Sequence, residues 1–141
     1  MSYLLDTCLL SELRKPDPDA NVVTWVNSID EARLFISAVT LGEIQKGIAK
    51  LEDSKRKRAF QVWLEQDLIE RFKGQVLAVD SDIALEWGSL QGEFARLGRP
   101  LPVIDSLIAA TAIRHNLTLA TRNTVDFERL PVKLLNPWTN Q

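Results

Sequence analysis

The segment Tyr3-Leu4-Leu5-Asp6-Thr7 places a carboxylate directly after a short apolar run at the start of the chain. Such a run predicts a buried strand, and Asp6 stands where that strand ends and a helix begins. A second carboxylate, Asp105, lies in a similar setting, because every other residue from 100 to 113 is uncharged. A carboxylate in apolar surroundings is costly unless it is paired, protonated or bound to a metal. The two acids therefore indicate a cation site at the ends of two secondary-structure elements.

Length and composition narrow the class of protein. The chain has 141 residues, of which 45% are hydrophobic and 26% charged, as expected for one globular domain covering residues 1–141. A net charge of -2 gives no overall attraction for nucleic acid, so nucleic-acid binding requires a local basic surface. One cysteine and one histidine exclude an internal disulfide and a zinc site built from His and Cys ligands. Without a membrane-spanning apolar run or a signal-peptide pattern, we expect a cytoplasmic protein.

Apolar segments that fit strands alternate with segments of helical periodicity. The predicted strands cover residues 3–5, 34–37, 76–79, 117–120 and 132–135. Because parallel strands need crossover connections, this alternation predicts a three-layer α/β/α fold with a mainly parallel sheet of four to five short strands. Helices that start at Thr40 and Lys55 are expected to form a hairpin, and residues 123–127 a turn. Ligands of such sheets bind beyond the carboxyl ends of the strands.

Four carboxylates follow predicted strands or stand near predicted helix starts: Asp6, Glu43, Asp105 and Asp126. In the alternating fold all four can face one crevice. Two such charges 4 Å apart repel by about 4 kcal/mol at an effective dielectric constant of about 20, so the cluster requires cations or raised pKa values. Oxygen ligands without His or Cys suit Mg²⁺ or Mn²⁺. Divalent ions held by carboxylates hydrolyse phosphodiesters through an activated water, which is the reaction these residues would support.

Each acid also has a structural alternative. Asp6 could cap the first helix, and Asp126 could be a solvated residue of a polar turn. Thr40 and Glu43 have the spacing of a capping box, which makes a cap the expected role of Glu43 from its position alone. For Asp105, interaction with the helix dipole contributes only about 0.3–1 kcal/mol. That is too little to explain a lone charge in such an apolar segment, so we favour a functional role there.

Four separated motifs resemble those of the PIN-domain ribonucleases, and among these the VapC toxins of bacterial toxin-antitoxin systems. The motifs are Leu-Leu-Asp-Thr-Cys-Leu-Leu-Ser-Glu-Leu-Arg-Lys-Pro (4–16), Ser-Ala-Val-Thr-Leu-Gly-Glu-Ile-Gln-Lys-Gly (37–47), Pro-Val-Ile-Asp-Ser-Leu-Ile-Ala-Ala-Thr-Ala (102–112) and Ala-Thr-Arg-Asn-Thr-Val-Asp-Phe (120–127). The match runs nearly end to end and includes the closing Asn-Pro-Trp. The resemblance implies a PIN-like fold and a Mg²⁺-dependent endoribonuclease that hydrolyses RNA. It also implies a homodimer, and a hetero-oligomer with a VapB-type antitoxin that inhibits the enzyme.

The resemblance also assigns roles to individual residues. Asp6 and Asp105 match the family's principal metal-binding acids, Glu43 matches the acid of the third helix, and Asp126 matches the fourth and most variable one. The resemblance thus favours a site role for Glu43 over the cap. Polar residues beside the family's site are matched by Thr7 and Asn123. Cys8 stands where many relatives have Asn, although neither is needed as a metal ligand.

Basic residues must hold RNA phosphates around an acidic pocket, because the acids themselves repel RNA. Arg122 is nearest to the site in sequence. Other candidates, each of which is also explained as a solvated charge, are Arg14, Lys15, Lys46, Lys50 and the run Lys55–Arg58. His115 is expected to be structural.

Other functional classes remain as alternatives to a toxin. A PIN fold could serve as a non-catalytic binding module, or as a housekeeping nuclease without an antitoxin. An aspartyl-phosphate phosphatase needs a second Asp two residues after the first, where this chain has Cys8. A phospho-receiver domain needs paired acids after the first strand and a Lys after the last, and the sequence has neither.

Overall fold

A five-stranded sheet in which every neighbouring pair is parallel forms the centre of the computed structural model, which describes residues 1–139. The strand order is β3-β2-β1-β4-β5. The strands are β1 (Tyr3–Leu5), β2 (Leu34–Ser37), β3 (Val76–Leu77), β4 (Thr118–Ala120) and β5 (Leu134–Leu135). This confirms the predicted α/β class with a short-stranded parallel sheet. The central strand β1 is the apolar run that opens the chain.

The two edge strands are shorter than the apolar runs that predicted them. Only two residues of β3 pair with β2, through Ile36–Val76 and Ser37–Leu77. Only two residues of β5 pair with β4. An edge strand pairs with a neighbour on one side only. The length of the apolar run there therefore does not fix how many residues pair.

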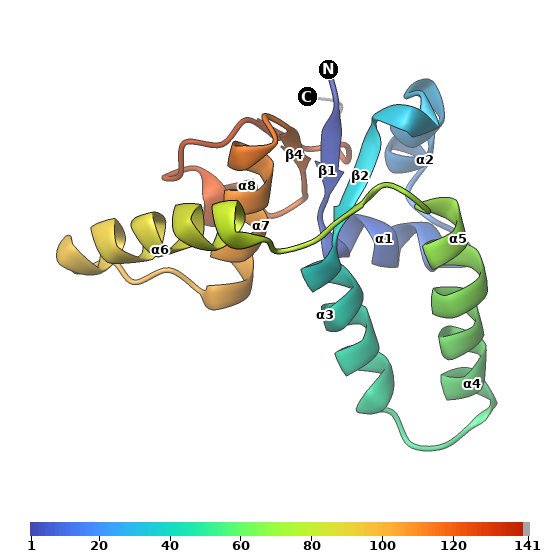
Figure 1. The fold of residues 1–141 in the computed structure, drawn as a ribbon. Coiled ribbons are helices and arrows are strands. Elements are labelled where there is room, and N and C mark those ends of the chain that lie inside the picture. The colour runs from blue at the N-terminus through green and yellow to red at the C-terminus, as the bar shows by residue number, and fades with distance from the viewer. Residues whose placement is uncertain (140–141) are drawn as a thin grey trace.

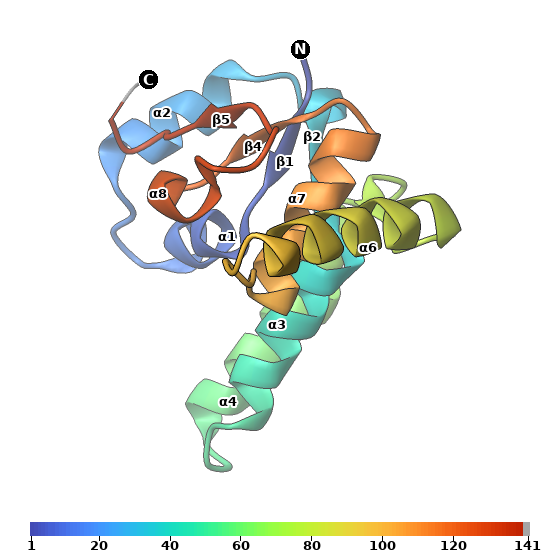
Figure 2. The same cartoon turned by 90° about the vertical axis from the view of Figure 1, so that its left-hand side faces the viewer.

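Helices cover both faces of the sheet, as the alternation of elements predicted (Figures 1 and 2). Tyr3 and Leu5 point to one face and Leu4 to the other, which is the two-residue period of a strand buried on both sides. The first face is covered by α1 (Thr7–Arg14), α2 (Ala20–Ser28), α3 (Ala38–Ala49) and the segment from α4 (Lys55–Val62) to α5 (Ile69–Arg71). The second is covered by α6 (Ser81–Arg96), α7 (Val103–Arg114) and α8 (Thr124–Phe127). A short 3₁₀ turn, η1 (Glu31–Arg33), precedes β2.

The helices α3 and α4 form the predicted hairpin, which extends away from the sheet (Figure 1). The helix expected from Lys55 onward is only partly confirmed, because it is not α-helical throughout. It passes through a π-helical segment, η2 (Trp63–Leu68), before α5. Leu64 and Leu68 of that segment are buried against the first face. No helix within residues 1–139 combines the length and apolarity needed to cross a membrane.

Two local predictions around the strand ends are wrong. Helix α3 begins at Ala38, not at Thr40, because Ser37 at the end of β2 caps it by accepting a hydrogen bond from the backbone N–H of Val39 at 3.1 Å. Thr40 is fully buried inside the helix, and Glu43 lies in its second turn, so the expected capping box does not form. The expected turn at residues 123–127 contains the short helix α8.

Candidate active site

Asp6 lies at the carboxyl end of the central strand and forms the N-cap of α1. Its Oδ1 accepts a hydrogen bond from the backbone N–H of Thr7 at 2.9 Å, and its Oδ2 accepts one from Thr121 Oγ1 at 2.7 Å. The side chain is buried, yet within residues 1–139 it has no ion pair. A carboxylate offers about four lone-pair positions, so these contacts orient Asp6 and leave room for a cation. The predicted cap and the predicted site position therefore coincide in one residue.

Glu43 reaches the same edge of the sheet from the second turn of α3. Its Oε1 accepts a hydrogen bond of 2.5 Å from Thr7 Oγ1, and the Thr7 hydroxyl also lies 3.4 Å from Thr40 Oγ1. A hydrogen bond to a charged acceptor is among the stronger ones in proteins. Thr7 thus links the start of α1 to α3 and holds Glu43 beside Asp6.

Asp105 lies in the first turn of α7 and is half-buried. Burial raises the pKa of its carboxyl, and the negative charges of Asp6, Asp126 and Glu43 raise that pKa further. The structure therefore brings three acids that are widely spaced in sequence within electrostatic reach of Asp105. Asp6 is the most buried of them and Asp126, in α8, is exposed.

The remaining sequence candidates take different positions. Asn123 is the residue before α8, and its backbone N–H donates to Thr121 Oγ1 at 3.0 Å. The guanidinium of Arg122 forms an ion pair with Glu12 at 3.2 Å and lies 4.3 Å from the centre of the Trp138 ring. Arg122 therefore already has a carboxylate partner and an aromatic contact within the protein.

Sequence analysis missed Thr121 and Glu12. Thr121 is fully buried and connects Asp6 with the backbone after β4. Glu12 is buried as well, and the hydrogen bonds from Lys15 and from the backbone N–H of Asp19, with the charge of Arg122, lower the pKa of its carboxyl. The only sequence signal for Thr121 was its place directly after a buried strand, and Glu12 had none.

Cys8 lies beside Asp6, whereas His115 lies away from Asp105. The Cys8 Sγ lies 3.7 Å from Asp6 Oδ2, and burial together with the charge of Asp6 raises the pKa of the thiol. His115 follows the last residue of α7, at the far end of that helix from Asp105.

Comparison with known proteins identifies the family of this fold. The PIN domain matches residues 3–133. The chain belongs to the PIN domain family. The toxin FitB of Neisseria gonorrhoeae is 36% identical to this PIN domain over 96% of the chain and 97% of FitB. The VapC ribonuclease Y4jK of Sinorhizobium fredii is 35% identical over 96% of both chains.

A solved structure of FitAcB from Neisseria gonorrhoeae has a closely similar fold. The match has a TM-score of 0.88 and 35% sequence identity, and it covers 96% of this chain and 98% of the other. The agreement extends across nearly the whole PIN domain. The strand order and the helices that carry the four acids therefore belong to an arrangement that this chain shares with a solved relative.

PIN-domain ribonucleases are generally dependent on a divalent metal, and the acids of this PIN domain have the chemistry for one. The donors are carboxylate oxygens, which suit hard divalent cations. Within residues 1–139, none of the four acids has a Lys, Arg or His partner, and their charges act against one another at Asp105. Within the described residues, no three Asp, Glu, His or Cys side chains lie close enough together to hold one metal ion. Carboxylates without a cation between them repel one another.

Proposed function

We propose that this PIN domain is an endoribonuclease toxin that hydrolyses RNA phosphodiesters with Mg²⁺ or Mn²⁺ held by Asp6, Glu43, Asp105 and Asp126. One observation carries the proposal: within residues 1–139, four carboxylates have no ion-pair partner and three of them act electrostatically on the fourth, Asp105, in a fold whose relatives are named ribonucleases and toxins. A bound divalent ion would activate a water molecule and stabilise the leaving oxygen. The carboxylates orient that water and accept its proton.

The hydrogen bonds around the acids support their proposed roles. Thr121 and the backbone of Thr7 fix the orientation of Asp6, and the Thr7 hydroxyl fixes Glu43. Hydrogen bonds to metal-binding carboxylates hold those carboxylates in the orientation that the metal needs. The raised pKa of Asp105 means that its carboxyl binds a proton more readily than an ordinary aspartate, so protons compete with a cation there. Metal binding is therefore expected to strengthen as the pH rises from acidic to neutral.

We further propose that an antitoxin of the VapB type neutralises the enzyme. Structural relatives of this chain include toxin–antitoxin complexes. We also propose a homodimer, supported by exposed apolar side chains on the elements of the second face of the sheet: Leu85, Val103, Ile104 and Val125. Size-exclusion chromatography with light scattering, alone and with the product of the neighbouring small gene, tests both assemblies.

RNA cleavage by the purified protein tests the nuclease proposal. Cleavage is expected with Mg²⁺ and not with EDTA, and the double variant Asp6→Asn/Asp105→Asn should be inactive. A matched control is Asp17→Asn/Asp53→Asn, which removes two exposed acids outside the site and should leave cleavage unchanged. Cleavage retained in the site variant would refute the metal site, and a wild type without activity would favour the non-catalytic binding module.

Expression in bacteria separates a toxin from a housekeeping nuclease. Growth arrest that the neighbouring gene product relieves is expected of the toxin. Normal growth together with active enzyme would favour the housekeeping role. Sequencing the cut ends of cellular RNA after brief induction then identifies the target.

A further inference from the structure

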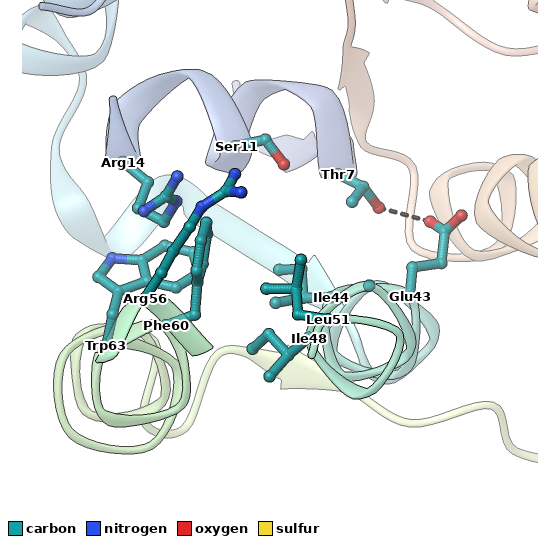
Figure 3. A pocket seen from close by; sticks show the side chains of 11 residues that line it. Thr7, Ser11, Arg14, Glu43, Ile44, Ile48, Leu51, Arg56, Phe60 and Trp63 are labelled. Carbon is teal, nitrogen blue, oxygen red and sulfur yellow. Dashed lines mark hydrogen bonds between the residues drawn. The ribbon is translucent and has the colours of Figure 1, made fainter. Parts of the chain in front are cut away.

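A cavity of about 260 Å³ extends from Glu43 along α1 and is open to solvent between α1, α3 and α4. Thr7 and Glu43 line one end, and Ser11, Arg14 and Arg56 line the other. Figure 3 shows the side chains from α1 facing those of α3 and α4 across this space. The cavity therefore connects the candidate active site to a pair of arginines.

Both arginines lie over the same aromatic ring. The guanidinium carbons of Arg14 and Arg56 are 3.4 Å and 5.4 Å from the centre of the Phe60 ring. Burial and the nearby charge of Arg56 lower the pKa of Arg14. Two like charges over one ring repel each other, so an anion between or beside them would relieve the repulsion.

Within residues 1–139, neither arginine has a carboxylate partner or donates a side-chain hydrogen bond to the protein. The contrast with other arginines of the described chain is clear, since four of them have an acidic partner. Those pairs are Arg58–Asp53, Arg71–Glu31, Arg114–Asp82 and Arg122–Glu12. A planar guanidinium with free N–H donors is well suited to hold a phosphate.

Arg56 also lies at an unusual place for a basic residue, in the first turn of α4. The N-terminus of a helix carries a partial positive charge, so Lys and Arg are unfavourable there. The same end of a helix attracts anions. The start of α4 therefore adds to the positive potential of the arginine pair.

The position of the pair fits an RNA strand that crosses the acids. Arg14 is the last residue of α1 and Thr7 is the first, which separates them by about 10 Å along the helix axis. An RNA strand that starts at the acids would place a phosphate one or two nucleotides away within reach of the long arginine side chains there. The wall formed by Ile44, Ile48 and Leu51 can contact the sugar and base between the two phosphates. The cavity volume is close to the lower end for small-molecule sites, about 300 Å³, and thus favours an occupant of nucleotide size.

We propose that Arg14 and Arg56 form a subsite for an RNA phosphate that flanks the one cleaved at the acids. This inference rests on the proposed ribonuclease function, and it assigns the two arginines a role in substrate positioning. Because they act on a neighbouring phosphate, they should contribute to RNA affinity more than to the chemical step.

Salt dependence of RNA binding tests the phosphate contact. The full-length Asp105→Asn protein, expected to be inactive, is titrated with a labelled single-stranded RNA in Mg²⁺ at several KCl concentrations. Each lost phosphate contact reduces the slope of log affinity against log salt by roughly 0.7 for single-stranded RNA. Adding Arg14→Gln/Arg56→Gln should thus reduce the slope by roughly 0.7 to 1.4 and weaken binding about tenfold at low salt. The control Arg33→Gln/Lys73→Gln removes two exposed positive charges near the amino ends of β2 and β3 and should change neither value.

Steady-state kinetics with the active enzyme provide a second measurement. Arg14→Gln/Arg56→Gln should raise KM and leave kcat nearly unchanged, since binding that is equal in substrate and transition state affects KM. The variant Arg14→Lys/Arg56→Lys keeps both charges and should recover most of the salt slope. Circular dichroism checks that each variant is folded, and Arg56→Gln alone tests the idea if the double variant is not.

The outcomes distinguish this inference from the proposed function. A wild type that does not cut RNA in Mg²⁺ would remove the ribonuclease proposal. Normal cutting with an unchanged salt slope and KM in the arginine variants would refute the phosphate subsite alone. If those variants bind RNA normally but lose affinity for the antitoxin, the cavity serves the protein partner, and the RNA subsite is likewise refuted.

Discussion

Replacing Thr121 with Val tests whether the hydrogen bonds around Asp6 prepare it to bind a metal. The Thr121 hydroxyl donates to Asp6 Oδ2 at 2.7 Å and accepts from the Asn123 backbone at 3.0 Å. Valine has nearly the same shape and makes neither contact. A hydrogen bond to a charged group contributes about 1.5–3 kcal/mol to stability. The lost bond from the Asn123 backbone N–H adds little, because Asn123 is exposed and this group can bond to water instead. We expect the free energy of unfolding to fall by about 2–3 kcal/mol.

Thermal unfolding in EDTA measures this loss. The entropy of unfolding of about 2.1 cal/mol/K per residue, applied to 141 residues, gives a shift of about 3 °C for each kcal/mol. The melting temperature of Thr121→Val should therefore be about 6–10 °C below that of the wild type. Removing a hydrogen-bond partner of a metal ligand typically weakens metal binding about 10–100-fold. The rise in melting temperature on adding Mg²⁺ should accordingly require higher concentrations in the variant.

The matched control is Thr111→Val in α7. Thr111 is also fully buried, but its hydroxyl donates to the Leu107 carbonyl of its own helix at 2.8 Å, away from the acids. This control should lose at most about 1 kcal/mol and keep the wild-type response to Mg²⁺. A melting temperature of Thr121→Val within 2 °C of the wild type, with unchanged Mg²⁺ affinity, would refute the reasoning about Asp6.

Three further predictions concern Asp105 and Arg122. Asp105→Asn should lower the rate of Mg²⁺-dependent cleavage at least about 100-fold. In EDTA at pH 7 the same change should leave the melting temperature unchanged or raise it slightly, because burial and three neighbouring acids disfavour the charge of the wild-type carboxylate. A clear fall in melting temperature would contradict this explanation. The folded-state pKa of Asp105 lies above its ordinary value of 3.8, so its favourable contribution to stability is complete below 3.8 and is lost as the pH rises through the folded pKa. Acidification in EDTA from pH 7 towards 4 should therefore reduce the difference in melting temperature between wild type and Asp105→Asn; a constant difference would show that the charge does not cause it. Arg122→Ala should lower the melting temperature by about 3–6 °C, because it removes the contacts with Glu12 and Trp138. It should leave the KM for RNA unchanged. A raised KM with an unchanged melting temperature would give Arg122 a role in substrate binding.

The centre of the sheet was predictable because its strands β1, β2 and β4 are largely buried on both faces. Such strands appear in sequence as short apolar runs, and the runs at Tyr3–Leu5 and Leu34–Ser37 match β1 and β2 residue for residue. The parallel arrangement followed from the helices between them. Strand ends at the edges were less predictable, since an apolar residue beyond the last paired residue carries the same signal as one within the strand.

The helix starts and the contacts between acids depend on tertiary structure, which the sequence pattern does not record. Ser37 and Thr40 are both good N-cap residues, and the end of β2 decides between them. The bond from Thr7 to Glu43 spans 36 residues and that from Thr121 to Asp6 spans 115. No local periodicity predicts such pairs. The carboxylate of Asp105 was identifiable from the sequence, because the residues around it are all uncharged and a charge among them is energetically unfavourable.

The distribution of ion pairs connects the net charge of the protein with its proposed substrate. A chain with net charge -2 does not attract RNA as a whole, so attraction must come from charges that the fold leaves without partners. Five ion pairs of the described residues neutralise some of the other charges, as in Arg71–Glu31 and Arg114–Asp82. The four acids and the arginine pair over Phe60 form no ion pairs within residues 1–139, and one of the acids, Glu43, lines the opposite end of the cavity from the arginines. A cation at the acids and a phosphate at the arginines would neutralise both groups, and an RNA strand with its metal ion supplies both charges together.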